Sequence, residues 1–238
     1  MKPRLIPFLA TLLVVAPALS AAHNQLTAKE KAAGWQLLFD GKSLNGWRVY
    51  AKKDTPIAGW QASDGTLRCF ATPKGEKAVG HNIITEKKFN DFELAWEWKL
   101  PPAGNNGIKY FVTEARTKSP GHEYQMLDDN AHPDAKMGAR RQTASFYEVL
   151  PPAADKPLKP IEEWNSSKIV VRGNNVEHWL NGKKVLTYEC GSEAVKAGVA
   201  QSKFKNDAGF GEKIVGHIML TYHNDDCWYR NIKIRELK

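Results

Sequence analysis

The sequence predicts an all-β protein built as a two-sheet antiparallel sandwich. About a dozen short stretches have strand character, and turn signals such as Asp-Gly and Asn-Gly separate them at short intervals. Helical patterns are scarce, and no close internal repeat is present that would indicate a propeller or a solenoid. A chain of 238 residues is of ordinary length for a single sandwich.

The N-terminus predicts export. A basic start is followed by an apolar run at 5–15 and by small residues that offer cleavage after Ser20 or Ala22. The run is too short to cross a bilayer comfortably, so residues 1–22 are typical of a secretory signal peptide rather than of an anchor. We therefore expect residues 23–238 to form one jelly-roll domain in a bacterial periplasmic or extracellular protein, without a membrane span in the mature chain.

The composition is that of an ordinary globular protein, with 42% hydrophobic and 25% charged residues. Loss of Lys2 and Arg4 with the signal would lower the net charge from +8 to +6. The basic residues are dispersed, which argues against a nucleic-acid partner. Cys69, Cys190 and Cys227 allow at most one intrachain disulfide and are too scattered for a zinc site.

The predicted elements follow the chain in order. Strands are expected at 34–42, 44–50, 59–63, 66–70, 92–100, 108–112, 121–127, 144–149, 164–172, 176–180, 183–188, 217–223 and 228–235. Short helices are expected near 23–33 and 192–205. Asp64-Gly65 predicts a tight hairpin, and the three strands within 164–188 predict a meander.

The clearest alternation lies in 92–100. Its apolar residues share a face that must be buried, and they are Phe92, Leu94, Trp96, Trp98 and Leu100. The opposite face carries Glu97, which would point outward or into a cleft.

Residues 121–130 carry the strongest indication of chemistry. Strict alternation places Glu123 and Gln125 on one face of a strand. A β-bulge after Gln125 would bring Asp128 to the same face, so that two carboxyls and an amide line one patch. The alternative is a solvated strand edge that runs into the Asp-Asp-Asn turn. The polar, proline-bearing connection 129–160 that follows is long enough to suggest a functional or mobile segment.

Several motifs occur together in a fixed order along the chain. They are Gly34-Trp35-Gln36-Leu37-Leu38-Phe39-Asp40-Gly41, Leu44-Asn45-Gly46-Trp47, Asn105-Asn106-Gly107-Ile108, Glu123-Tyr124-Gln125-Met126-Leu127-Asp128, Glu163-Trp164-Asn165, His178-Trp179-Leu180-Asn181-Gly182 and Arg230-Asn231-Ile232-Lys233-Ile234. No single motif is specific, but the ordered set resembles the 3-keto-disaccharide hydrolase domain family over residues 34–238.

This resemblance implies a concanavalin A-like jelly roll whose concave sheet face holds carbohydrate. It also implies similarity to laminarinase-like glycosidases, in which acidic residues at i, i+2 and i+5 share a bulged strand. Glu123, Gln125 and Asp128 have that spacing, with an amide at the middle position. The expected protein is a hydrolase or lyase of 3-keto-glycosides. The alternatives are a carbohydrate-binding module without catalysis and a structural or calcium-dependent adhesion domain.

A ketone at C3 of a sugar acidifies the proton at C2 and lies beta to the glycosidic oxygen. Cleavage by elimination and rehydration then needs one base and one acid. We expect Glu123 to act as the base, Asp128 or His223 as proton donor or partner, and Gln125 to hold hydroxyls or the enolate oxygen. Classical hydrolysis would instead use Glu123 and Asp128 as an acid and nucleophile or base pair.

Further residues are candidates for substrate binding, and each has a structural alternative such as core packing or a solvated position. They are Glu97, Asn106, Lys109, Tyr147, Trp164 and Arg230. His178 is expected to be a packed strand residue rather than a catalytic one. No cofactor is expected, although Glu123, Asp128 and His223 could together bind a divalent cation despite a spacing that matches no recognised metal motif.

Overall fold

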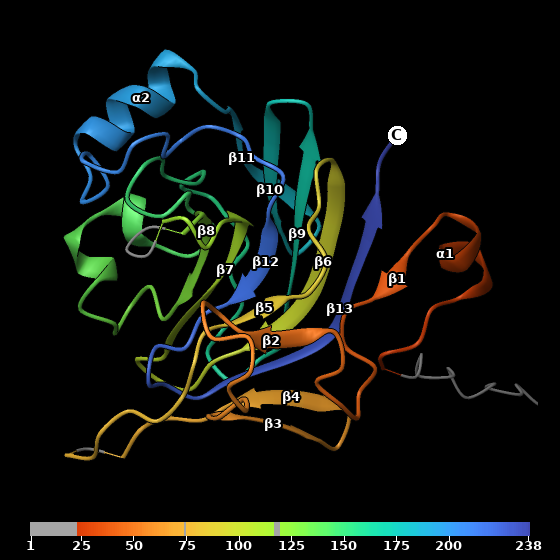
Figure 1. The fold of residues 1–238 in the computed structure, drawn as a ribbon. Coiled ribbons are helices and arrows are strands. Elements are labelled where there is room, and N and C mark those ends of the chain that lie inside the picture. Colours follow the sequence, from red (N-terminus) through yellow and green to blue (C-terminus); the bar gives the residue numbers. More distant parts are fainter. Residues whose placement is uncertain (1–22, 74, 117–119) are drawn as a thin grey trace, which may run out of the picture.

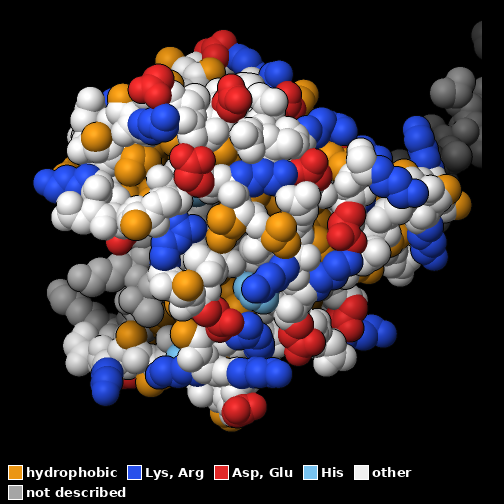
Figure 2. All heavy atoms as spheres, turned by 45° about the horizontal axis from the view of Figure 1, so that its top comes forward, with side chains coloured by type: hydrophobic (Ala, Val, Ile, Leu, Met, Phe, Trp, Pro, Cys, Tyr) orange, Lys and Arg blue, Asp and Glu red, His pale blue; other side chains and the backbone are white. Residues whose placement is uncertain are grey.

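A computed structural model describes residues 23–73, 75–116 and 120–238. The predicted signal peptide, 1–22, lies outside the described residues. The chain forms two antiparallel sheets packed face to face, as Figure 1 shows, so the predicted two-sheet jelly-roll sandwich is confirmed. No helix among the described residues is long and apolar enough to span a membrane. On the face drawn in Figure 2, Lys and Arg side chains lie interspersed with Asp and Glu.

The larger sheet has the strand order β11-β10-β9-β6-β13-β4-β3, with β1 also paired to β13. Its strands are β1 (Gln36–Leu37), β3 (Trp60–Ser63), β4 (Thr66–Cys69), β6 (Phe92–Lys99), β9 (Asn165–Arg172), β10 (Asn175–Leu180), β11 (Lys183–Glu189) and β13 (Cys227–Glu236). The smaller sheet has the order β2-β5-β12-β7-β8. Its strands are β2 (Trp47–Val49), β5 (Ile83–Thr85), β7 (Asn105–Val112), β8 (His122–Leu127) and β12 (His217–Leu220).

Within the described residues, helical structure is confined to short pieces. They are α1 (Ala28–Ala32), α2 (Glu193–Ala200) and the 3₁₀ turns η1 (Ala135–Met137) and η2 (Ala139–Arg141). Figure 1 shows α2 above the green turns of the connection 129–160, on the β8 side of the molecule. The long connection is therefore folded against one end of the smaller sheet.

The hairpin and the meander are where the sequence predicts them. β3 pairs with β4 around Asp64 and Gly65, which both adopt the positive φ that a tight primed turn requires. β10 pairs with β9 on one side and β11 on the other. The two last predicted strands belong to different sheets, β12 to the smaller and β13 to the larger, so 221–226 crosses between the layers.

Two predicted elements differ from the structure. The strand expected at 108–112 begins earlier, because Asn105-Asn106-Gly107 already pairs with β8 as the start of β7. The segment 144–149, expected as a strand, contains only isolated bridges at Phe146. Ala144 and Glu148 have φ of 67° and 63°, and this left-handed backbone interrupts any regular strand.

The core between the sheets confirms the alternation in β6. Trp96 and Trp98 are buried and meet the partner layer, since the Trp96 indole N–H points at Met126 Sδ of β8 at 3.3 Å. The opposite face of β6, with Glu97, therefore looks away from the smaller sheet. Cys69, Cys190 and Cys227 are buried free thiols, and burial raises the pKa of Cys69 to about 12.

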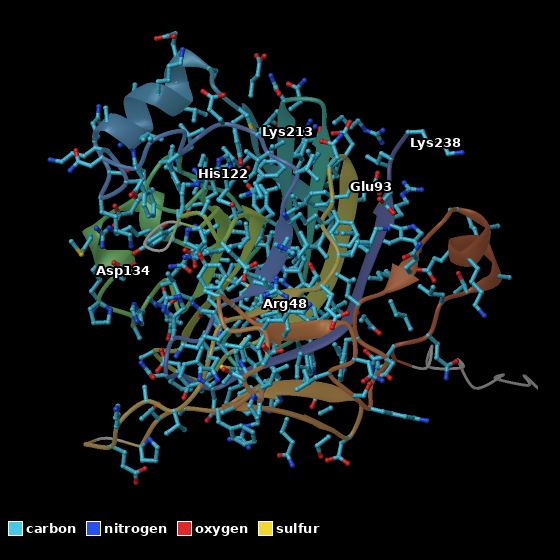
Figure 3. All side chains as sticks on the ribbon, viewed as in Figure 1. Arg48, Glu93, His122, Asp134, Lys213 and Lys238 are labelled. Atoms are coloured by element: carbon cyan, nitrogen blue, oxygen red, sulfur yellow. The ribbon has the colours of Figure 1, made fainter. Side chains whose placement is uncertain are left out.

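The interior also holds a chain of hydrogen bonds between aromatic side chains. His178 Nδ1 lies 2.9 Å from the carbonyl oxygen of Ala144, so Nδ1–H donates and Nε2 accepts from Tyr110 Oη at 2.7 Å. Tyr110 Oη then accepts from Tyr188 Oη at 2.6 Å, which accepts from His122 Nδ1 at 2.9 Å. His122, labelled in Figure 3, lies in the interior, and both imidazoles are neutral in this arrangement.

Candidate active site

Glu123 lies on the face of the smaller sheet that points away from the core, on the edge strand. It lies on β8, directly opposite Lys109 of β7, and both alternate with residues that enter the core. Lys109 Nζ is 3.4 Å from Glu123 Oε2, and His223 Nε2 is 3.7 Å from Oε1. Glu123 is only 5% exposed, and its Oε1 has no hydrogen-bond partner among the described residues. An unsatisfied buried carboxylate oxygen is costly and is a common feature of reactive sites.

A glycine makes room for this carboxylate. A Cβ at Gly107 would lie 2.4 Å from Glu123 Oε1, far inside van der Waals contact. Any other residue at position 107 would therefore displace the carboxylate or distort the strand. The Asn-Asn-Gly motif of the sequence thus ends in a residue that the site geometry requires.

The charges around Glu123 keep it ionised despite its burial. Burial alone would raise the pKa of the carboxyl, but the positive charge of Lys109 and the contact with the His223 imidazole, with a smaller contribution from Lys203, lower the pKa to about 2. Glu123 is thus a carboxylate at every pH at which the protein is expected to work. An ionised, largely buried carboxylate beside an imidazole can take a proton from a substrate carbon.

His223 is positioned by the crossing between the sheets. Its neighbour Tyr222 donates its backbone N–H to Asn82 Oδ1 at 2.7 Å. The Tyr222 ring packs so closely on Gly80 that a Cβ there would be 2.0 Å from the ring, and its hydroxyl lies 2.9 Å from Thr72 Oγ1. These contacts fix the loop, while the imidazole itself is 37% exposed and accessible to substrate.

The free edge of β8 is covered by the irregular segment 143–147. Tyr147 donates its N–H to the Glu123 carbonyl at 3.0 Å, and Ala144 donates to the Gln125 carbonyl at 2.8 Å. The Tyr147 hydroxyl donates to Asp134 Oδ2 at 2.8 Å. The connection 129–160, which the sequence marked as functional or mobile, thus holds a phenol next to Glu123.

Lys203 is a residue of this neighbourhood that sequence reasoning missed. Its Nζ lies 4.4 Å from the centre of the Tyr147 ring and 3.7 Å from Glu148 Oε1. It follows α2, inside a stretch that the sequence marked only as helical. No local motif distinguishes it from the other lysines, so only the packing of α2 on the connection reveals it.

Asp128 does not join Glu123, because the predicted bulge after Gln125 is wrong. The β7–β8 register is continuous from Asn105↔Leu127 to Tyr110↔His122. The Asp128 carboxylate instead accepts backbone N–H groups, from Ala103 at 2.9 Å and from Asn130 and Ala131 at 3.0 and 3.1 Å. Burial would raise the pKa of Asp128, but these bonds lower it. Its carboxylate holds the turn that ends β8.

This role predicts that Asp128→Ala destabilises the fold. Loss of acceptors for three backbone N–H groups should cost about 1–3 kcal/mol of unfolding free energy. Thermal or urea unfolding measures the loss, and the turnover of the remaining folded protein should fall less than tenfold, by the rate equivalent of about 1.4 kcal/mol. A loss of turnover as large as that of a Glu123 variant, without a loss of stability, would show that Asp128 takes part in chemistry.

Four other candidates from the sequence lie away from Glu123. Asn106 points between the sheets, where its Oδ1 accepts from the Tyr229 hydroxyl at 2.8 Å. Glu97 and Arg230 pair on the outer face of the larger sheet, with Arg230 Nε 2.6 Å from Glu97 Oε2. The Arg230 guanidinium stacks 3.9 Å from the centre of the Trp164 ring. Glu97 and Arg230 lie in strands where the sequence predicts them, but alternation could not say that these strands belong to the larger sheet, and Asn106 lies outside the predicted strand 108–112.

The structure therefore brings Glu123, Gln125, Lys109, Tyr147 and His223 together and leaves Asp128 at the end of the strand. Among residues 23–73, 75–116 and 120–238, no group of at least three His, Cys, Asp or Glu side chains is arranged to hold a metal ion. The trio Glu123, Asp128 and His223 is not assembled as one set of ligands.

Known proteins similar to this chain belong to the family that its ordered motifs resemble. The model of the 3-keto-alpha-glucoside-1,2-lyase-like domain matches residues 34–235. A protein of Bacteroides thetaiotaomicron named 3-keto-disaccharide hydrolase is 35% identical over an alignment 245 residues long. The alignment covers 92% of this chain and 83% of that protein.

Two crystal structures from Parabacteroides distasonis, both provisionally described as glycosyl hydrolases, share the fold. One superposes with a TM-score of 0.80 at 32% identity and covers 91% of this chain and 100% of its own. The other has a TM-score of 0.65 at 26% identity and covers 85% of this chain and 99% of its own. The chain therefore belongs to the family of 3-keto-alpha-glucoside-1,2-lyase-like domains.

Proposed function

We propose that this protein is an exported carbohydrate hydrolase or lyase that cleaves 3-keto-glycosides, with Glu123 as the catalytic base. The observation that carries the proposal is the nearly buried Glu123 carboxylate, which is ionised between Lys109 and His223 and whose Oε1 accepts no hydrogen bond within 3.5 Å from the described residues. The family and its Bacteroides relative, named for 3-keto-disaccharide hydrolysis, support the substrate class.

The proposed reaction is an elimination followed by a hydration. Glu123 removes the C2 proton, which the C3 ketone acidifies, and Lys109 stabilises the enolate oxygen by its charge. The electron pair then forms the C1–C2 double bond as the bond from C1 to the glycosidic oxygen breaks. Protonated His223 gives its proton to the departing oxygen, and water adds across the double bond to yield the free 3-keto sugar.

Elimination suits this site better than classical two-carboxylate hydrolysis. A glycosidase of that kind needs a second carboxyl group across the scissile bond. Asp128 is held by backbone N–H groups, and Asp134 and Glu148 are both paired with Arg141. The base and the proton donor closest to each other are therefore Glu123 and His223.

A substrate screen tests the proposal. The purified protein should release sugar from 3-keto-disaccharides and leave the unoxidised disaccharides intact. Reaction in D₂O should place deuterium at C2 of the product, because the C2 proton is exchanged during elimination and hydration. Cleavage of unoxidised substrates alone, or binding without turnover, would overturn the proposal, and the second result would indicate a carbohydrate-binding module.

Export is the other part of the proposal, and residues 1–22 support it by composition. Expression of the full chain in a Gram-negative host should place the protein in the periplasmic or extracellular fraction. N-terminal sequencing should then begin at Ala21 or His23. Retention of Met1 on protein in the cytoplasm would contradict it.

A further inference from the structure

A hollow of about 440 Å³, within the range of small-molecule pockets, lies in the connection 129–160 where that connection meets the end of α2. It is formed by the turns η1 and η2, by 148–151 and by the end of α2. Its lining includes the side chains of Met137, Arg140, Arg141, Glu148, Pro151 and Gln201. Figure 3 labels Asp134 in the connection that carries these turns, below α2.

Two residues, Lys203 and Tyr147, lie between the hollow and the strand that carries Glu123. Glu148, on its wall, is 3.7 Å from Lys203 Nζ, and this ammonium group lies over the Tyr147 ring at 4.4 Å. Tyr147 in turn is hydrogen-bonded through its N–H to the backbone of Glu123. The positive charge of Lys203 also contributes to the lowered pKa of Glu123. A ligand that extends from Glu123 past Tyr147 and Lys203 would therefore reach the hollow.

The walls are held in place by ion pairs and backbone bonds. Arg141 bonds Asp134 and lies 2.6 Å from Glu148 Oε1, so its charge is neutralised. The Glu148 N–H donates to the Arg140 carbonyl at 2.8 Å. These contacts fix the shape of the hollow before any ligand binds, which reduces the entropy cost of binding.

The remaining lining suits a neutral, hydroxyl-rich ring. The half-buried Arg140 donates from Nη1 to the neutral Gln201 Oε1 at 2.9 Å and keeps further N–H groups for a ligand. Met137 is 69% exposed at the mouth, and Pro151 offers a second apolar surface. A pyranose presents an apolar C–H face and a rim of hydroxyls, which match Met137 with Pro151 and Arg140 with Gln201.

We propose that this hollow binds the departing sugar of a 3-keto-disaccharide, while the oxidised ring lies at Glu123. The inference rests on the proposed function and deepens it, because it makes a second sugar ring part of the substrate that the protein recognises. A substrate without that ring cannot contact Met137, Arg140 or Gln201.

Two single variants, Arg140→Ala and Met137→Ala, test the inference against two substrates. The first substrate is a 3-keto-disaccharide, and the second is the methyl 3-keto-glucoside, which lacks the departing ring. Loss of a charged hydrogen-bond donor should lower kcat/KM for the disaccharide about 10- to 100-fold in Arg140→Ala. We expect Met137→Ala to lower it about 3- to 10-fold through lost apolar contact. The value for the methyl glycoside should change less than about twofold in both variants.

Lys136→Ala is the matched control, because Lys136 is an exposed cation of the same turn that does not line the hollow. Its kinetics should equal those of the unmodified protein on both substrates. If Arg140→Ala and Met137→Ala lose equally on both substrates, or lose on neither, the inference is overturned and the proposed function is left intact. Inactivity of the unmodified protein on both substrates would overturn the proposed function and the inference with it.

Discussion

Glu123→Gln should abolish most of the turnover of 3-keto-glycosides while the protein still binds them. The amide keeps the size of the carboxylate but cannot accept the C2 proton, and removal of a general base typically lowers the rate about 10²- to 10⁴-fold. Steady-state kinetics gives kcat, and titration calorimetry with the same substrate gives the affinity of the slow variant. We expect kcat to fall by this factor and the dissociation constant to change less than about tenfold.

Glu97→Gln is the matched control, since it makes the same chemical change on the opposite sheet. Glu97 pairs with Arg230 and accepts from Asn231 at 3.0 Å, on a face that looks away from Glu123. The turnover of the Glu97→Gln variant should be close to that of the unmodified protein. Equal losses in the two variants would mean that a general loss of structure, not a missing base, explains the result. Full activity of Glu123→Gln would exclude Glu123 as the base.

The sequence predicts most of the fold because the fold depends on local patterns. Alternation in 92–100 identifies the buried tryptophans, and alternation in β8 puts Glu123 and Gln125 on one face. Asp64-Gly65 predicts its hairpin because the backbone of a tight primed turn needs positive φ. Each of these features depends only on residues that are close together in the sequence.

The site could be predicted only in part, because it depends on contacts between distant segments. Asp128 would share a face with Glu123 only if a β-bulge followed Gln125. Residue spacing alone cannot establish a bulge, and the continuous β7–β8 register excludes one. Trp164 and Arg230 were assigned to the sugar site because their residue types suit sugars, but they lie on the larger sheet. Lys203 reaches Glu148 and Tyr147 only through the packing of α2 and its following turn.

The acid stability of the protein should be limited by its buried histidines, chiefly the fully buried His122 and His178, and burial also lowers the pKa of His217. Burial lowers the pKa of His122 to about 3, helped by the charge of Arg116, and lowers the pKa of His178 to about 4. Both values lie below the ordinary histidine pKa of about 6.5. The unfolded chain therefore binds more protons than the folded one between these values, and stability falls as the pH is lowered from about 6.5. Each histidine contributes a slope of up to about 1.4 kcal/mol per pH unit.

The direction of the hydrogen-bond chain gives a structural reason for this effect. His178 Nε2 accepts from Tyr110, and a proton there would place two donors against each other. His122 Nε2 is buried without a hydrogen-bond partner among the described residues, so a proton there would create an unsatisfied charged N–H. Protonation of His178 would reverse the donors along the chain and move the His122 proton to Nε2, where it has no acceptor among the described residues.

Urea unfolding at a series of pH values between 7 and 4.5 measures the slope, which should approach roughly 3 kcal/mol per pH unit near the lower end when both histidines contribute. His178→Gln cannot titrate at this position, so its slope should be lower by up to about 1.4 kcal/mol per pH unit, even if its stability at pH 7 is lower. Carboxylates with a lowered pKa, such as Glu30, Glu114 and Glu123 at about 2, add their own loss as the pH falls through the ordinary glutamate pKa of about 4.3, so the histidine contribution is clearest above about pH 5.5. An unchanged slope in His178→Gln would mean that His178 is not the group that takes up a proton on unfolding.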